Sequence, residues 1–172
     1  MKIAISNRQK LYRIDLRRVE RLTAYLATQA RRLAPERTWN EISLVLGDDA
    51  LIRPLNAQYL QRDNATDVIS FQYEPIPGVA AAPDGEIVVN VERAVQEGSN
   101  RRGRSPSQEL ALYIAHGCNH LTGADDDSQT RRNRMRQREL RWLRSASQRA
   151  MTEGLITQPL RRHKGSPPVL PR

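Results

Sequence analysis

The stretch from Ser105 to Asp127 constrains the fold most, because its first part has the features of a capped helix and its second part those of a polar turn. Ser105 can cap the helix, Pro106 suits its first turn, and Gln108 completes a capping box with Ser105. Apolar side chains then recur at near-helical spacing: Leu110, Leu112, Tyr113, Ile114, Ala115 and Leu121. Gly123 is the type of residue that commonly ends a helix. The sequence therefore predicts an apolar-striped helix that begins at Ser105 and stops just before Gly123.

Two of the three histidines in the chain lie in this helix, and three aspartates follow it. His116 and His120 are four residues apart, so their side chains project side by side from one helical face and can reach one cation. A helix that stops and folds back would bring Asp125, Asp126 or Asp127 near the histidines as an oxygen ligand. The alternative is a polar stripe followed by a solvated turn, and the spacing alone leaves both interpretations open.

The residues beside the two histidines limit the chemistry. Metalloproteases of the familiar type carry Glu directly after the first His as general base, and here that residue is Gly117, so a peptidase is disfavoured. Cys118 is the lone cysteine, which excludes an intramolecular disulfide and an all-cysteine metal site and is consistent with a reducing compartment. Because Cys118 lies two residues from each histidine, it points off their face. We expect a small buried residue there rather than a ligand.

The charge of the chain indicates a polyanionic partner. The formal net charge is +9 and the isoelectric point is near 10.5, which favours nucleic acid or an anionic membrane surface. All but three of the 28 basic residues are arginine, a residue that suits bidentate phosphate contacts, although genomic base composition also produces such a bias. No apolar run is long enough to span a membrane and no signal peptide is evident, so we expect a cytoplasmic protein.

The order of the expected elements predicts the fold class. Strands are expected at residues 2–6, 41–47, 68–71 and 85–91, with a Pro, Gly and Ala-rich loop at 75–84. Helices are expected at 15–33, after Asp48, from Ser105, and at about 128–152, with a basic loop at 98–104. This order predicts an α+β fold: a small mixed four-stranded sheet flanked by helices, with the metal site on the central helix and the following turn. We expect one domain over residues 1–155 and a basic, proline-rich, disordered tail over 156–172.

Three segments resemble the bacterial YbeY family of metal-dependent endoribonucleases and ribosomal RNA maturation factors. Residues 55–71, L-N-A-Q-Y-L-Q-R-D-N-A-T-D-V-I-S-F, are similar to the family's L-N-x-x-Y-R-x-x-D-x-P-T-D-V-L-S-F-P. Residues 84–94, D-G-E-I-V-V-N-V-E-R-A, resemble its G-D-I-x-I-x-x-x-x-A. The stretch H-G-C-N-H-L-T-G-A-D-D from His116 resembles its H-G-x-L-H-L-x-G-Y-D-H. Order and spacing match, and the likeness spans about residues 40–150.

The resemblance implies a four-stranded sheet flanked by helices and one zinc ion held by three histidines at relative positions 0, 4 and 10. In this chain those positions are His116, His120 and Asp126. A carboxylate is a competent zinc ligand and shifts metal preference toward harder ions. The family's Arg after the Tyr of the first motif is Leu60 here, and Arg62 is a poorly placed substitute because two residues along a helix turn it away. Asn119, Ala124 and Ala65 replace family residues and are expected to be packing changes.

The resemblance implies a single-strand-specific endoribonuclease that acts in ribosomal RNA maturation and ribosome quality control. His116, His120 and Asp126 would be its catalytic and metal-binding residues, with one Zn²⁺, and single-stranded ribosomal RNA and the small ribosomal subunit would be its partners. Asp125 would orient a histidine or cap the next helix, and Thr66 and Asp67 would lie near the cleft or only form a turn. Phosphates would meet the arginines at 101, 102, 104, 131, 132, 134, 136 and 138. The alternative is a non-catalytic ribosome assembly module with an altered metal site.

Overall fold

The computed structural model describes residues 1–73, 84–100 and 103–159. Its centre is a mixed sheet of four strands in the order β1, β3, β5, β4. β1 (Lys2–Asn7), β3 (Glu41–Gly47) and β5 (Gly85–Asn90) are parallel, and β4 (Val68–Gln72) pairs antiparallel with β5. The predicted α+β class with a mixed four-stranded sheet is therefore confirmed.

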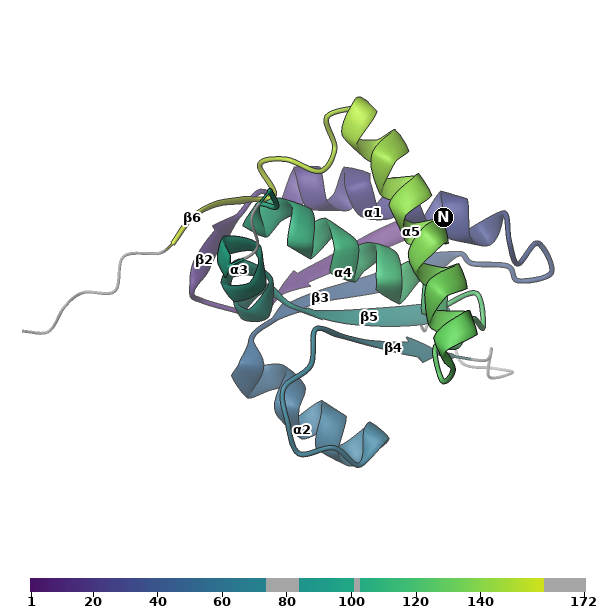
Figure 1. Cartoon of the computed structure of the whole chain (residues 1–172), viewed down its shortest axis with the longest axis horizontal. Helices are drawn as coiled ribbons and strands as arrows, with labels where there is room; N and C mark the ends of the chain where they lie inside the picture. The colour runs from purple at the N-terminus through teal and green to yellow at the C-terminus, as the bar shows by residue number, and fades with distance from the viewer. Residues whose placement is uncertain (74–83, 101–102, 160–172) are drawn as a thin grey trace, which may run out of the picture.

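Helices cover the two faces of this sheet unequally (Figure 1). α1 (Leu16–Arg31), α4 (Pro106–His120) and α5 (Gln129–Gln148) lie on one side, whereas α2 (Asp49–Leu60) lies on the other. The alternation of strand residues explains both layers, since Ile87 and Val89 join the larger core while Val88 packs with Ile52 of α2. β5 is thus apolar on both faces, as its sequence predicts.

α4 is the central helix of the larger layer. Its capping box is present, because Ser105 Oγ accepts from the Gln108 backbone N–H and the Gln108 side chain accepts from the Ser105 N–H. Most of its side chains are buried, including Cys118, whose thiol pKa is raised to about 12 by burial. The prediction of a small buried residue at this position is confirmed. α5 and α3 (Val91–Asn100) pack against α4, so the histidine helix is held on several sides.

Gly117 lets α4 lie close to the sheet beside the two histidines. A Cβ at this position would overlap Ile87 Cγ2 and would come within 3.2 Å of Ser70 Oγ and Val68 Cγ2. We expect Gly117→Ala to lower the free energy of unfolding by about 1 to 3 kcal/mol, because overpacking outweighs the gain in helix propensity. Urea unfolding measures this. Gly103→Ala would be an unsuitable control because Gly103 has a positive φ, so Ala57→Gly, at a partly exposed position within α2, serves as the control for helix propensity.

A second sheet departs from the sequence prediction. β2 (Tyr12–Ile14) lies between the predicted strand at 2–6 and the predicted helix at 15–33, where no strand is expected, and it pairs antiparallel with β6 (Ile156–Pro159). Assignment of residues 156–159 to the tail is therefore corrected, because their backbone pairs with a strand far away in the sequence. The remaining tail, 160–172, and most of the predicted loop at 75–84 lie outside the described residues.

Smaller differences concern helix ends. α3 continues to Asn100, so the first residues of the predicted basic loop at 98–104 are helical. α5 ends at Gln148, a turn earlier than predicted, and is capped at its N-terminus by Ser128. Asp48 caps α2 as expected, since its side chain accepts from the Leu51 N–H. Among the described residues, none of the helices has the length and apolar character that crossing a bilayer would require.

Candidate metal centre

The two histidines of α4 face each other across a short gap. His116 Nε2 and His120 Nε2 are 3.1 Å apart, and their rings meet edge to face. Both residues are partly buried near the C-terminal end of the helix, one turn apart. The side-by-side geometry predicted from the four-residue spacing is confirmed.

The turn after α4 brings a carboxylate back to this pair. Gly123 adopts a positive φ of 82° and its N–H donates to the His120 carbonyl, so the chain reverses direction at once. Asp126 then lies with Oδ2 at 3.9 Å from His116 Nε2. Donor atoms of His116, His120 and Asp126 all lie within 4.8 Å of one another. The prediction that the chain folds back after the helix and brings an aspartate near the two histidines is confirmed.

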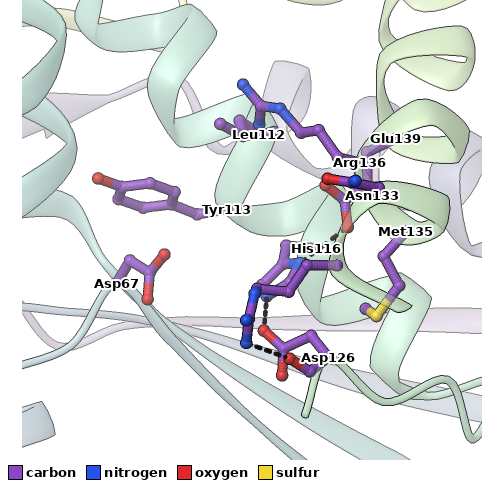
Figure 2. Close-up of a pocket in the computed structure, with 10 residues that line it drawn as sticks. Asp67, Leu112, Tyr113, His116, Asp126, Asn133, Met135, Arg136 and Glu139 are labelled. Carbon is purple, nitrogen blue, oxygen red and sulfur yellow. Dashed lines mark hydrogen bonds and ion pairs between the residues drawn. The ribbon is translucent and has the colours of Figure 1, made fainter. Parts of the chain in front are cut away.

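The outer nitrogen of each imidazole is already bound. His116 Nδ1 lies 2.7 Å from Glu139 Oε1 of α5, and His120 Nδ1 donates to the Ala124 carbonyl at 3.0 Å. Figure 2 shows His116 between the carboxylates of Glu139 and Asp126. With hydrogen on both Nδ1 atoms, each neutral ring turns a lone pair at Nε2 toward the other. Two such lone pairs at 3.1 Å are stable only with a proton or a metal ion between them.

Glu139 is held in turn by residues that the sequence analysis did not assign to the site. Asn119 Nδ2 donates to Glu139 Oε1 at 3.0 Å, and Arg138 Nη1 donates to Asn119 Oδ1 at 2.8 Å. Glu139 and Asn119 are almost fully buried. Interpretation of Asn119 as a packing change is therefore corrected: its amide fixes the carboxylate that orients His116. The sequence does contain one feature that could have pointed to Glu139: it is the single acidic residue within the arginine-rich α5.

The donor set fits a divalent metal ion. Bonds of about 2.0 to 2.1 Å at tetrahedral angles separate neighbouring ligand atoms by roughly 3.3 Å. The two Nε2 atoms already lie near that spacing, and the Asp126 oxygen lies slightly farther away. Hydrogen bonds from Nδ1 to a carboxylate and to a carbonyl are the usual support of metal-bound histidines. Two imidazoles and one carboxylate also form a catalytic zinc set that leaves a coordination position open.

Burial and charge give the two histidines different acidities. Burial lowers the pKa of His116, but the hydrogen bond and charge of Glu139 outweigh it and the pKa is raised. Burial and then the nearby charge of His116 lower the pKa of His120. Burial raises the pKa of Glu139, but the hydrogen bond to His116 outweighs it and the pKa is lowered. The His116–Glu139 pair therefore stabilises the metal-free fold at pH values between the lowered pKa of Glu139 and the raised pKa of His116. This contribution is lost as the pH rises through the pKa of His116 or falls through the pKa of Glu139.

A pH titration tests this difference in the metal-free protein. We expect imidazole NMR signals of His116 to titrate above the ordinary histidine pKa and those of His120 below it. In Glu139→Gln the acceptor charge is gone while burial remains, so the pKa of His116 should fall below the ordinary value. Equal pKa values for the two rings in the unmodified chain would contradict the assignment of Glu139 as the partner of His116.

A cavity of about 300 Å³ opens beside the metal-binding cluster. Figure 2 shows Asp67 and Tyr113 on one side of it, and Met135 and Glu139 of α5 on the other. Asp67 Oδ1 accepts from Thr66 Oγ1 and from the Val68 N–H, so Thr66 has a turn role while Asp67 also lines the cavity. Burial, then the charges of Glu109 and Asp67, raise the pKa of Tyr113, which keeps its hydroxyl protonated.

Asp125 fills neither of its two predicted roles. Its Oδ1 accepts from the Asp126 N–H, and its other oxygen lies 3.8 Å from Arg131 Nη1. Helix α5 is capped by Ser128 instead, and the histidine rings are oriented by Glu139 and the Ala124 carbonyl. The adjacent Asp127 also pairs with Arg131, at 2.9 Å, so Asp126 is the aspartate of the three that joins the histidines.

The predicted phosphate-binding arginines separate into several groups. Arg132 and Arg136 line the cavity. Arg104, Arg131 and Arg138 are engaged with Glu109, Asp127 and Asn119. Arg134 is exposed, and Arg101 and Arg102 lie outside the described residues. Leu60 is half exposed, and neither Leu60 nor Arg62 lines the cavity, so α5 supplies its positive charge instead.

Comparison with known proteins identifies the family. A family model described as endoribonuclease YbeY matches residues 4–147. The chain belongs to the YbeY family. An endoribonuclease YbeY from Anaeromyxobacter sp. is 33% identical over 162 residues, which cover 94% of this chain and 77% of that protein. One from Rhodopirellula baltica is 44% identical over 94 residues, 54% of this chain, and the match spans 47% of that relative's length.

A solved structure shares the fold of this chain. The solution structure of TM1509 from Thermotoga maritima aligns with a TM-score of 0.56 at 20% sequence identity. The alignment covers 88% of this chain and 93% of that one. The resemblance noted from three sequence motifs is confirmed, and it extends over the described sheet and its helices.

Proposed function

We propose that this chain is a zinc-dependent endoribonuclease that cleaves single-stranded ribosomal RNA, with His116, His120 and Asp126 as metal ligands and catalytic residues. The observation that carries the proposal is the convergence of three donor atoms while both Nδ1 nitrogens are bound elsewhere. Membership of the YbeY family supports the choice of RNA as substrate. The net charge of +9 suits the same polyanion.

His116, His120 and Asp126 would hold a divalent ion, which would supply Lewis acidity toward a phosphoryl oxygen and a bound water. The protein supplies position and charge. Arg132 and Arg136 line the cavity beside the cluster and offer guanidinium groups to phosphate oxygens. Asp67 lines the same cavity with its carboxylate and can accept a hydrogen bond from water or a ribose hydroxyl. Glu139 holds the proton of His116 Nδ1 in place, so that Nε2 keeps its lone pair toward the cavity.

The alternative function, a non-catalytic ribosome assembly module, is disfavoured. The matched relatives are named endoribonucleases, and the buried support of His116 by Glu139 and Asn119 is intact. Burying the Glu139 carboxylate costs free energy, so we expect it to be kept because His116, which it orients, has a function. We further propose that the small ribosomal subunit is the partner that presents the RNA, which places the activity in the cytoplasm. The third possibility, a peptidase, lacks the glutamate general base after His116.

Cleavage assays with and without a chelator test the proposed function. The purified protein should contain one metal ion per chain and should cut single-stranded RNA but not the same sequence in a duplex. Chelator should stop cleavage, and Zn²⁺ should restore it. RNA binding without cleavage at any metal concentration would favour the assembly module. Chelator-sensitive degradation of casein would revive the peptidase.

A further inference from the structure

A second groove lies on the far side of Leu112 from the metal cavity. Its volume is about 260 Å³, and it runs between the start of α4 and the last turns of α5. We define the second groove by Arg104, Leu112, Leu140, Arg144 and Thr152, which line it together with Leu143. Leu140 and Leu143 are only half buried, so the groove has an apolar floor that solvent reaches.

The second groove and the metal cavity form one track along α5. Leu112 lines both. Arg132 and Arg136 in the metal cavity, and Leu140 and Arg144 in the second groove, follow at four-residue steps and so form a stripe that winds gradually around the helix. Arg144 lies twelve residues after Arg132, a distance of about 18 Å along the helix axis at the helical rise. An extended strand that enters the metal cavity can therefore continue past Leu112 into the second groove.

One buried polar atom in the second groove has no partner. Thr152 is 3% exposed, and its Oγ1 forms no hydrogen bond with the described part of the chain. A buried hydroxyl without a partner costs free energy that a bound ligand can recover. Thr152 lines the groove together with the apolar floor, so a ligand with both an apolar surface and a polar edge would match these groups.

Arginines complete the chemistry of the second groove. Arg104 is fixed by Glu109 at 2.9 Å, and a guanidinium held in one position offers a flat surface on which a base can stack. Arg144 is exposed at the rim, and no ion pair to it is formed by the residues the structure describes. A planar base over Leu140 and Arg104, with its phosphate at Arg144, would use all of these groups.

We propose that the second groove binds a nucleobase of the same single-stranded RNA whose scissile phosphate lies in the metal cavity. Arg144 contacts the phosphate next to that base, and Thr152 Oγ1 hydrogen-bonds the base edge. This proposal rests on the proposed endoribonuclease function. It assigns the preference for single strands to a physical cause, because only an unpaired base can turn away from its neighbours and enter the groove.

Binding of RNA oligonucleotides of two lengths to the metal-free protein tests the second groove. Fluorescence anisotropy compares a dinucleotide, which fills the metal cavity alone, with an oligonucleotide of about eight residues, which reaches both sites. The unmodified chain should bind the longer RNA more tightly. Arg144→Gln should weaken that binding about threefold to tenfold, leave the dinucleotide unchanged, and reduce the salt slope by about 0.7.

Matched variants distinguish the contribution of the second groove to RNA binding from that of positive charge elsewhere on α5. Arg141→Gln removes the same charge from an exposed position on α5 that lines neither the metal cavity nor the second groove, and it should change neither the length dependence nor dinucleotide binding. Thr152→Val keeps the side-chain volume and should weaken binding of the longer RNA about twofold to tenfold. It should not lower the melting temperature, because the hydroxyl has no partner to lose.

Equal affinity for both RNA lengths would overturn the proposal, as would equal effects of Arg144→Gln and Arg141→Gln. In either case, cleavage that still depends on metal would continue to support the proposed endoribonuclease function. Absence of both RNA binding and cleavage would overturn the two proposals together.

Discussion

Replacing His116 with alanine should remove the bound metal and lower the rate of single-stranded RNA cleavage by about a thousandfold. Such a decrease corresponds to the loss of several kcal/mol of transition-state stabilisation. His116 is the central member of the cluster, since its Nε2 lies 3.1 Å from His120 Nε2 and 3.9 Å from Asp126 Oδ2. Its loss also leaves the buried Glu139 carboxylate without its 2.7 Å partner. Metal content and single-turnover cleavage are the two measurements.

His163→Ala is the control, because it removes the one histidine of the chain outside the cluster. It should keep full metal content and activity. Circular dichroism and urea unfolding show whether the His116 variant stays folded, and His116→Asn, which keeps a polar side chain at the Glu139 contact, guards against a folding defect. If a folded His116 variant cleaves RNA at the rate of the unmodified chain, the cluster is not the catalytic centre.

Glu139→Gln should weaken metal binding about tenfold to a hundredfold while the protein stays folded. The side chain keeps its shape, but the charge that orients His116 is lost, and the hydrogen bond at 2.7 Å becomes a neutral one. Asn119→Leu should have a smaller effect of the same kind, because it removes the donor to Glu139 Oε1 at 3.0 Å and leaves the carboxylate charge in place. Competition with a chromophoric chelator measures both affinities.

Glu20→Gln provides the same chemical change at an exposed position of α1 and should leave metal affinity unchanged. Comparing the single variants with the Glu139→Gln, Asn119→Leu double variant tests the network directly. Asn119 acts through Glu139, so the double variant should be no weaker than Glu139→Gln alone. Additive losses would show that Asn119 supports the site by another route.

Local signals in the sequence were sufficient for most of the fold. The capping box at Ser105, the cap at Asp48 and the apolar run of β5 each depend on neighbouring residues, so the helices and strands they define were predicted nearly to their ends. The fold-back turn was also predictable, since Gly123 supplies the positive φ that a helix end requires. His116 and His120 follow from helical spacing alone.

The missing parts depend on contacts between residues far apart in the chain. β2 and β6 are three and four residues long. They form by pairing with each other although almost the whole domain separates them in sequence, and no local pattern encodes that pairing. Glu139 is 23 residues from His116, and only the packing of α5 on α4 brings the two together. Choosing Asp126 among three consecutive aspartates depended on family resemblance, whereas the structure separates them by the pairing of Asp127 with Arg131.

The bound metal of the unmodified chain and of Asp126→Ala, quantified on the same folded preparations, tests the metal centre most directly. Asp126 supplies the single oxygen of the donor set and lies on a turn, so its removal leaves the α4 core intact. We predict one ion per chain in the unmodified protein and well under half of that in the variant. Full occupancy with unchanged affinity in Asp126→Ala would contradict the assignment of this aspartate as a ligand.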